Sequence, residues 1–279
     1  QGVIMTHSFP ADNFYSAIVK NATASPSKTI IFEEDLKISN RQLVDYVDKV
    51  AGYLASIGIA PGNKVALVMS NSWQFVVNFF AISKLGAVVV PVNNFLKEDE
   101  IAYILNDAQA KVLFCSAKFA KETHDLLIKT NICKIIWVDG LPIENDKNIS
   151  HEKILAAPTL PVATFAAKLE DLAVIVYTSG TTGKPKGAML SFKNIFSNIY
   201  CALTHLRVKS GKLNMVCYLP MFHAFTLTIT VLLPVITNSN VTIIRSIATK
   251  GDFAKLLKQV LLKRIPFFVG VPDVYSALA

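Results

Sequence analysis

The stretch from Tyr177 to Gly187 combines the groups that proteins use to bind phosphate. Its sequence, Tyr-Thr-Ser-Gly-Thr-Thr-Gly-Lys-Pro-Lys-Gly, holds four Ser/Thr hydroxyls, two lysines and three glycines in eleven residues. Glycines let backbone N–H groups point into one concavity without steric penalty. Hydrogen bonds to a charged group contribute about 1.5 to 3 kcal/mol, against about 1 kcal/mol for neutral ones. The stretch therefore predicts a loop that binds a polyphosphate.

This loop differs from the P-loop of common nucleotidases. That motif requires a Gly five residues before its Gly-Lys pair and a Ser or Thr directly after the Lys. Thr178 occupies the first of these places and Pro185 the second. Consequently no hydroxyl follows Lys184 to hold magnesium. The apolar run of residues 172–176 predicts a buried strand before the loop, which argues against a flexible linker.

A second candidate is His223, in the stretch Leu219-Pro-Met-Phe-His-Ala-Phe225. The pattern places it just after a strand, between Phe222 and Phe225. A histidine among apolar residues is more often part of a core than a catalyst. Sequence pattern alone therefore leaves both interpretations open.

The loop resembles the signature of the adenylate-forming (AMP-binding) superfamily, which includes acyl-CoA synthetases, aryl-CoA ligases and amino-acid-activating domains. Two earlier stretches, 54–67 and 84–93, also resemble the opening core of family members in order and spacing. The resemblance covers roughly residues 9–279. It is strongest to the N-terminal portion of an acyl-CoA synthetase or long-chain fatty-acid–CoA ligase.

The resemblance implies an acid–thiol ligase that converts a fatty-acid carboxylate to an acyl-adenylate and then an acyl-CoA. It implies ATP, Mg²⁺ and CoA as reactants and cofactors, and His223 as the catalytic residue where the carboxylate meets the α-phosphate. An aryl-acid–CoA ligase, a synthetase that loads an acyl-carrier protein, and a non-catalytic nucleotide-binding protein stay open as alternatives. The residues assigned to the β- and γ-phosphates are Thr178, Ser179, Gly180, Thr181, Thr182, Gly183 and Lys184, with Lys186 in a supporting role.

Within the resemblance, a Phe-His pair is typical of acyl- and aryl-activating members, whereas amino-acid-activating members tend to carry Phe-Asp. His223 therefore argues against an amino-acid substrate. The sequence departs from the family pattern at Thr226, where many relatives have Gly, and at Phe192, where many have His. These departures concern the size of the substrate that the site accepts and not the class of reaction.

Strand and helix patterns alternate along the chain and predict an α/β fold of mostly parallel sheets flanked by helices. We expect a first α/β subdomain at 9–165 and a second at 166–279, with a loop-rich connection at 141–161. Family segments for adenine, ribose and the C-terminal lid are absent, so we expect residues 1–279 alone to be catalytically incomplete. The expected elements are strands at 64–69, 87–92, 111–115, 134–138, 214–219, 241–244 and 267–271, and helices at 39–57, 72–85, 98–106, 117–129 and 191–206.

Composition limits the functional class. The chain has 279 residues, a mean hydropathy of +0.42 and a net charge of +8. Residues 184–264 hold 12 basic side chains against Asp252 alone. This field suits ATP, CoA phosphates or an anionic membrane face, although a solvated outer face explains it equally; no nucleic-acid motif accompanies it.

We expect no signal peptide, no membrane span and a cytoplasmic protein, with peripheral contact at the inner membrane face left open. The N-terminus lacks a basic region followed by an apolar core. The cysteines are expected to be reduced and buried, without a disulfide or a zinc site. They are Cys115, Cys133, Cys201 and Cys217.

Overall fold

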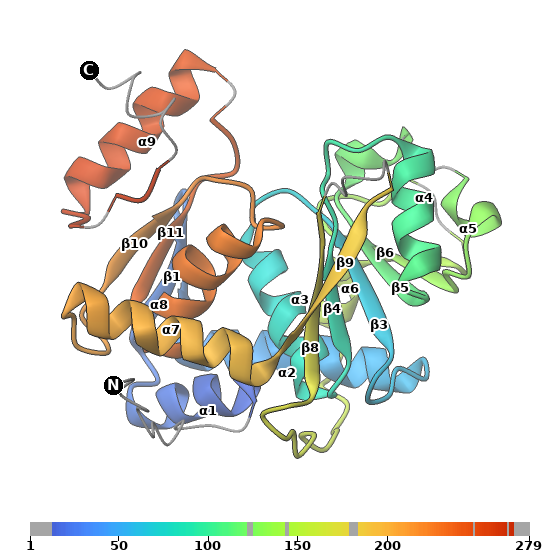
Figure 1. The fold of residues 1–279 in the computed structure, drawn as a ribbon, viewed down its shortest axis with the longest axis horizontal. Helices are drawn as coiled ribbons and strands as arrows, with labels where there is room; N and C mark the ends of the chain where they lie inside the picture. The colour runs from blue at the N-terminus through green and yellow to red at the C-terminus, as the bar shows by residue number, and fades with distance from the viewer. Residues whose placement is uncertain are drawn as a thin grey trace, which may run out of the picture.

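The computed structural model describes residues 13–121, 125–142, 145–178, 184–247, 249–266 and 268–270. It contains two β-sheets that lie side by side with helices between and around them (Figure 1). The expected α/β fold with mostly parallel strands is confirmed. The chain passes between the sheets more than once, since its first two strands join its last two in the smaller sheet. The predicted subdomain boundary near residue 165 stays a prediction.

The larger sheet has seven strands in the order β7-β6-β5-β3-β4-β8-β9. Every neighbouring pair is parallel except the last, in which β9 runs antiparallel to β8 along the edge. Fully buried apolar strands such as β3 and β4 are typical of a parallel sheet covered on both faces. The strands are β3 (Lys64–Val68), β4 (Val88–Pro91), β5 (Ala110–Cys115), β6 (Lys134–Trp137), β7 (Asn148–Ser150), β8 (Leu172–Thr178) and β9 (Lys186–Ser191).

The smaller sheet has four strands in the order β10-β11-β1-β2. Its inner strand β1 pairs in parallel with β11, more than 200 positions later in the chain, and antiparallel with β2. Such a pairing joins the two ends of the described chain into one sheet. The strands are β1 (Thr29–Glu33), β2 (Leu36–Ser39), β10 (Asn214–Cys217) and β11 (Asn240–Ile243).

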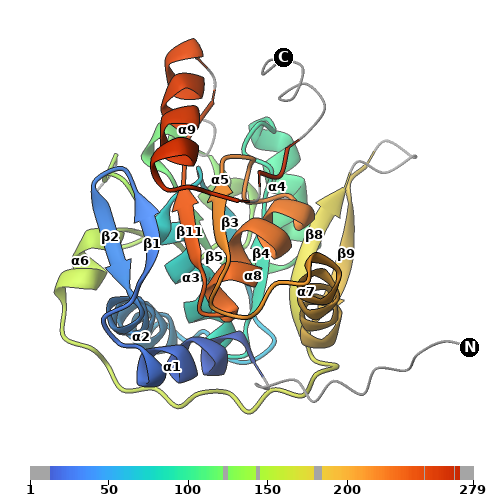
Figure 2. The ribbon, with the colours of Figure 1, turned by 90° about the vertical axis from the view of Figure 1, so that its left-hand side faces the viewer.

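Helices fill the space between the sheets and cover their outer faces (Figure 2). Several begin at side-chain caps: Ser39 caps α2, Ser72 caps α3 and Ser191 caps α7, each by accepting from a backbone N–H of the first turn. The α-helices are α1 (Phe14–Ala24), α2 (Asn40–Ser56), α3 (Trp73–Lys84), α4 (Glu98–Asp107), α5 (Leu126–Lys129), α6 (His151–Ala156), α7 (Phe192–Leu206), α8 (Leu233–Ile236) and α9 (Lys250–Leu262).

The main core lies where α1, α3 and α7 meet. The ring of Phe14 lies 5.6 Å from that of Phe79, 4.7 Å from Phe192 and 5.0 Å from Phe196, measured between centroids. All four side chains are almost fully buried. Tilted aromatic pairs at these distances add to the free energy of burial. Phe192, which departs from the family pattern, therefore contributes to the core.

Several local predictions were wrong. Residues 117–129 form a 3₁₀ turn (Ala117–Phe119) and the short helix α5, not one helix, with 122–124 outside the described residues. The connection 141–161 contains strand β7 and helix α6. The phosphate loop leads into strand β9 before the helix at 192. The expected strand at 267–271 falls partly outside the described residues, and 268–270 are not a strand.

The cysteine prediction holds in part. No disulfide joins any two of the four cysteines among the described residues. Cys115 and Cys217 are buried, whereas Cys133 and Cys201 are exposed, which contradicts the expected burial. Cys201 lies on α7 outside the buried set formed by Phe192, Ile195, Phe196 and Ile199, so the helical period places it toward solvent.

Candidate active site

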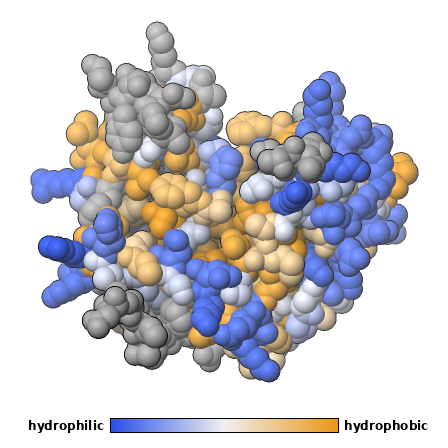
Figure 3. Space-filling view, in the orientation of Figure 1, coloured by the Kyte–Doolittle hydropathy of each residue, from blue (hydrophilic) through white to orange (hydrophobic). Residues whose placement is uncertain are grey.

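A cavity of about 770 Å³ opens between the two sheets, at the carboxyl ends of β4, β8 and β10. Ligand sites of open α/β sheets occur at this end of the strands. Figure 3 shows apolar surface along the valley between the two sheets, with hydrophilic residues on the outer flanks. The cavity is lined by Pro91, Asn93, Leu96, Glu100, Ile104, Val176, Tyr177, Thr178, Pro185, Leu219, Pro220, Phe222, His223, Ala224, Phe225 and Thr226.

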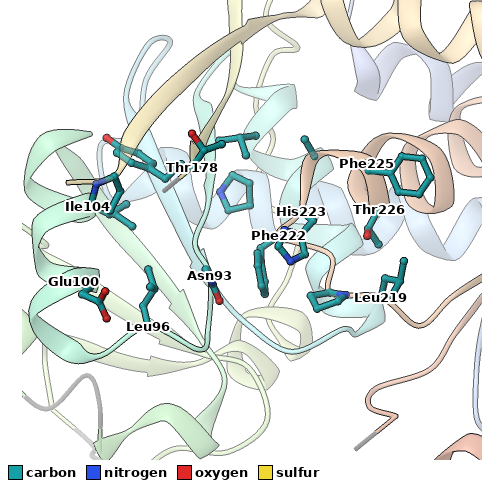
Figure 4. A pocket seen from close by; sticks show the side chains of 16 residues that line it. Asn93, Leu96, Glu100, Ile104, Thr178, Leu219, Phe222, His223, Phe225 and Thr226 are labelled. Carbon is teal, nitrogen blue, oxygen red and sulfur yellow. The ribbon is translucent and has the colours of Figure 1, made fainter. Parts of the chain in front are cut away.

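His223 lies in the wall that follows β10 (Figure 4). Its backbone N–H donates to the carbonyl of Pro220 at 3.2 Å, and its carbonyl accepts from the N–H of Leu227 at 2.9 Å. His223 therefore lies between a tight turn and the helical segment Thr226–Leu232, which has π-helical hydrogen bonding. Its ring lies 4.3 Å from that of Phe222, measured between centroids.

The imidazole of His223 is exposed at the cavity, yet the surrounding apolar groups remove part of its hydration. This partial desolvation lowers the pKa of His223 below its ordinary value. A lowered pKa keeps the ring neutral at pH 7, with one nitrogen as a donor and the other as an acceptor. The interpretation of His223 as a core residue is therefore wrong, because its side chain faces a cavity.

The opposite wall comes from the loop after β4 and from helix α4. Asn94 fixes this loop by donating from Nδ2 to the carbonyl of Met69 at 2.7 Å. The loop places Phe95 edge-on to Phe222, with 6.0 Å between ring centroids. On α4, Glu100 accepts from the N–H of Lys97 at 2.9 Å and lines the cavity (Figure 4).

No function was predicted from the sequence for this wall. Asn93 fell within the stretch that resembles the family, without an assigned role. The usable signal was the Asn93-Asn94 pair directly after a buried strand, since polar residues there meet other strand ends. Nothing local in the helix α4 indicated that Glu100 and Ile104 face a site.

The structure places the two ends of the predicted phosphate loop. Thr178 ends β8, lines the cavity and pairs across the hairpin with Lys186 on β9. Ser179, Gly180, Thr181, Thr182 and Gly183 lie outside the described residues, so their assignment to phosphates stays a prediction. Thr178 and His223 both line the same cavity.

Both lysines of the loop are exposed. The ammonium of Lys184 lies 5.5 Å from the centroid of the Tyr103 ring on α4, which suits a cation–π contact. Lys184 and Lys186 are not among the side chains that line the cavity. Pro185, between them, does line it.

The base of the hairpin is closely packed. A Cβ atom at Gly187 would lie 2.7 Å from Cγ2 of Ile175, so a larger residue there would have to displace that side chain. The hydroxyl of Tyr177 donates to Oδ2 of Asp107 at 2.5 Å and ties β8 to the end of α4. Burial, the hydrogen bond and the charge of Asp107 all raise the pKa of Tyr177, so it stays protonated.

Comparison with known proteins decides the family. A family model described as "AMP-binding enzyme" matches residues 18–279. The chain belongs to the AMP-binding enzyme family. Feruloyl-CoA synthase from an Amycolatopsis species is 30% identical over 94% of this chain and 49% of its own length. Tyrocidine synthase 3 from Brevibacillus parabrevis is 27% identical over 97% of the chain and 4% of its own length.

The fold agrees with this membership. The crystal structure of a long-chain-fatty-acid-CoA ligase (FadD1) from Archaeoglobus fulgidus superposes with a TM-score of 0.86 at 22% identity. The match covers 98% of this chain and 54% of that one. The chain thus spans about half the length of the CoA-ligase relatives it matches. The names of these relatives refer to different acids, so family membership does not identify the substrate class.

Proposed function

We propose that this chain forms the acid- and phosphate-binding part of an AMP-forming acyl-CoA synthetase acting on fatty acids. The observation that carries the proposal is the cavity of about 770 Å³ in which Thr178, at the end of the predicted phosphate loop, and His223 share one largely apolar lining. A concave apolar site with few polar groups is typical of small-molecule binding. A fatty acid offers both an apolar tail and a carboxylate to such a site.

Each set of residues has one task in the proposed reaction. The hydroxyls and amides of residues 178–183 and the charge of Lys184 hold the β- and γ-phosphates of ATP and then the leaving pyrophosphate. Neutral His223 donates a hydrogen bond where the acid's carboxylate attacks the α-phosphorus. Positioning and charge stabilisation of this kind supply most of the catalysis of such transfers. The thiol of CoA then displaces AMP from the acyl-adenylate and gives the thioester.

The family resemblance also implies Mg²⁺. The described residues contain no group of three or more His, Cys, Asp or Glu side chains that could hold a metal ion. Among the described residues that line the cavity, Glu100 is the one acidic side chain, and it already accepts a hydrogen bond from the N–H of Lys97. We therefore assign no residue of this chain to the metal and derive no step through it.

A fatty acid is favoured over an aryl acid by the apolar length of the lining, which runs from Ile104 and Leu96 to Leu219 and Phe225. Each buried methylene contributes about 0.8 kcal/mol, so such a lining selects for tail length. An aryl acid is the second candidate, since Phe222 and Phe225 can stack on a ring. The 30% identity to feruloyl-CoA synthase supports this alternative.

ATP–pyrophosphate exchange by the complete protein tests the proposal, with fatty acids of graded length and several aryl acids. Exchange that rises with aliphatic length is the expected result. Exchange with aryl acids alone would favour the second candidate. Absence of exchange with every acid, despite measurable ATP binding, would leave a nucleotide-binding protein and reject the proposed reaction.

The same assay on residues 1–279 alone tests the expectation that this part does not complete the reaction. Acyl-adenylate formed by these residues would contradict it. The compartment is a separate question. Among the described residues, every helix is too short or too polar to cross a membrane. A cytoplasmic site, with peripheral contact at the inner membrane face, stays part of the proposal.

A further inference from the structure

Asn71 lies three residues after the end of β3 and is buried, with 5% of its surface exposed. It does not line the cavity. Its Nδ2 donates to the carbonyl of Leu219 at 2.9 Å and to the carbonyl of Ile244 at 3.2 Å. Its Oδ1 accepts from the backbone N–H of Met221 at 2.9 Å. One side chain thus satisfies three backbone groups that lie just beyond the ends of β10 and β11.

Two of these three bonds flank the turn that carries His223. The Leu219 carbonyl and the Met221 N–H are both held, and the next link is the His223 N–H bonded to Pro220. The two peptide groups on either side of Pro220 are therefore both held by Asn71, and the second of them also accepts from the His223 N–H. The side chain that fixes them comes from the segment that follows β3 of the larger sheet.

The bond from Asn71 to the Ile244 carbonyl links β10 and β11 beyond the last backbone hydrogen bond between these two strands. The final backbone bond between β10 and β11 joins the Ile244 N–H to the Cys217 carbonyl at 2.9 Å. Beyond this point Asn71 bonds to both chains, at Leu219 and Ile244. Without it, buried backbone groups at this edge would lose their partners, and such groups are nearly always paired in native proteins.

The same short segment also holds the opposite wall of the cavity. Met69, two residues before Asn71, accepts through its carbonyl from Asn94, which fixes the loop of Asn93 and Leu96. Residues 69–71 thus attach both walls to the end of β3. A shift of this segment would change the distance between the two walls.

We propose that Asn71 is a positioning residue that fixes His223 relative to the phosphate loop. The role rests on the proposed function, because it concerns where the acid's carboxylate meets the α-phosphate. Asn71 touches neither the cavity nor the reacting atoms, so it acts through the turn 219–223. A buried amide suits this task since it supplies two donors and an acceptor in one plane.

The test uses two readouts on the complete protein, for wild type, Asn71→Ala and a control. The first readout is the rate at which diethyl pyrocarbonate modifies each histidine as pH is varied, measured by peptide mass spectrometry. This reagent reacts with neutral imidazole and reports the apparent pKa and access of His223 without turnover. The second readout is ATP–pyrophosphate exchange.

The control is Asn40→Ala. Asn40 is also buried, and its Nδ2 donates to the carbonyl of Ser25 and to Oδ1 of Asn238, both at 2.9 Å. Its replacement removes comparable hydrogen bonds that have no contact with the turn of His223. Thermal unfolding places the two variants on one stability scale, so that loss of stability alone cannot explain a difference between them.

In Asn71→Ala we expect the pH of half-maximal His223 modification to rise toward that of an ordinary histidine, because a freed turn exposes the ring to water. Modification of His205 on α7 should not change. We expect kcat for exchange to fall about 10²-fold, as small displacements of a catalytic group do. Asn40→Ala should leave both quantities near wild type.

Asn71→Ser covers the case in which the alanine variant does not fold. Its hydroxyl can replace part of the hydrogen bonding of the amide without introducing a charge, so a smaller fall in kcat is expected. An unchanged His223 profile and kcat in either folded variant, or an equal change in Asn40→Ala, would overturn the role of Asn71. A wild type without exchange would reject the proposed function, whereas the modification profile would still decide on Asn71.

Discussion

Gly86 lies directly against the ring of Phe165: a Cβ atom at Gly86 would be 2.4 Å from Cδ1 of the ring. Gly86 ends helix α3 with φ of +67°, and Phe165 belongs to the segment that joins α6 to β8. The N–H of Phe165 donates to the Lys84 carbonyl at 2.9 Å, and its carbonyl accepts from Nδ2 of Asn13 at 2.8 Å. This contact fixes the connecting segment beneath the larger sheet.

Gly86→Ala should therefore destabilise the fold through two separate effects. The left-handed backbone costs alanine about 1 to 2 kcal/mol, and forcing a methyl group into a packed contact costs about 1 to 3 kcal/mol more. Gly62→Ala isolates the first effect, since Gly62 has φ of +79° and nothing within 4 Å of the added Cβ. Urea unfolding of both variants gives the steric part as a difference. Equal losses in the two variants would mean that the Phe165 contact yields without cost.

The sequence predicted the parallel strands well because each is a short apolar run bounded by a cap or a turn. β3, β4, β5 and β6 were all placed within two residues of their observed ends. Such strands are buried on both faces, so their pattern does not depend on what they pair with.

The pairings between distant segments could not be predicted in this way. β1 finds its partner β11 some 200 residues later, and no local pattern encodes that contact. β9 was missed because Lys-Gly-Ala-Met-Leu-Ser lacks β-branched and aromatic residues and its strand is mostly half-buried or exposed at the sheet edge. The wall formed by Glu100 and Ile104 depends on the same kind of tertiary packing. The loop that begins at Thr178 was predicted from its residue pattern, whereas the role of His223 rested on resemblance.

A buried histidine makes the stability depend on pH. The side chain of His151 is 1% exposed. The amide nitrogen of Asn78 donates to the sulfur of Met69, so Oδ1 of Asn78 accepts from Nε2 of His151 at 2.8 Å. Burial lowers the pKa of His151 to about 4, from 6.5. Between pH 6.5 and pH 4, His151 is therefore protonated in the unfolded chain but neutral in the folded chain.

The sign follows from this difference. The contribution of neutral His151 is complete above pH 6.5 and is lost as pH falls toward 4. At 1.36 kcal/mol per pKa unit, it amounts to about 3 kcal/mol across that window. We expect wild type to lose this amount relative to His151→Gln when urea unfolding is compared at pH 7 and pH 4. His205→Gln, on α7, should follow wild type; a parallel loss in His151→Gln would assign the effect to other groups.

The two lysines of the phosphate loop should differ in their effect on ATP. A charge-assisted hydrogen bond contributes about 1.5 to 3 kcal/mol, so Lys184→Ala should weaken ATP binding by about 10- to 100-fold. Lys186 lies exposed on β9 across from Thr178, and its replacement should change affinity less than about 3-fold, as an exposed charge does. Titration calorimetry without acid substrate measures both. Lys184→Arg keeps the positive charge and shows how much of the affinity depends on that charge alone. Equal losses of ATP affinity in the two alanine variants would contradict the assignment of Lys184 to the phosphates.

The size of Thr226 should set the length of acid that the cavity accepts. Thr226 is 1% exposed and lines the cavity. Thr226→Ala removes a methyl group and a hydroxyl from the wall, and each methylene of added tail that fills the space is worth about 0.8 kcal/mol, or roughly 4-fold in kcat/KM. We expect the preferred fatty acid to lengthen by about one carbon in the exchange assay.

Thr226→Val, which keeps the volume, should retain the wild-type preference. Thr228→Ala supplies the matched control, because Thr228 is buried two residues later and is not part of the cavity lining. A shift in chain length that appears in Thr228→Ala as well would come from a change in the helical segment 226–232 rather than from the wall. A shift confined to Thr226→Ala would place the acid's tail against this residue.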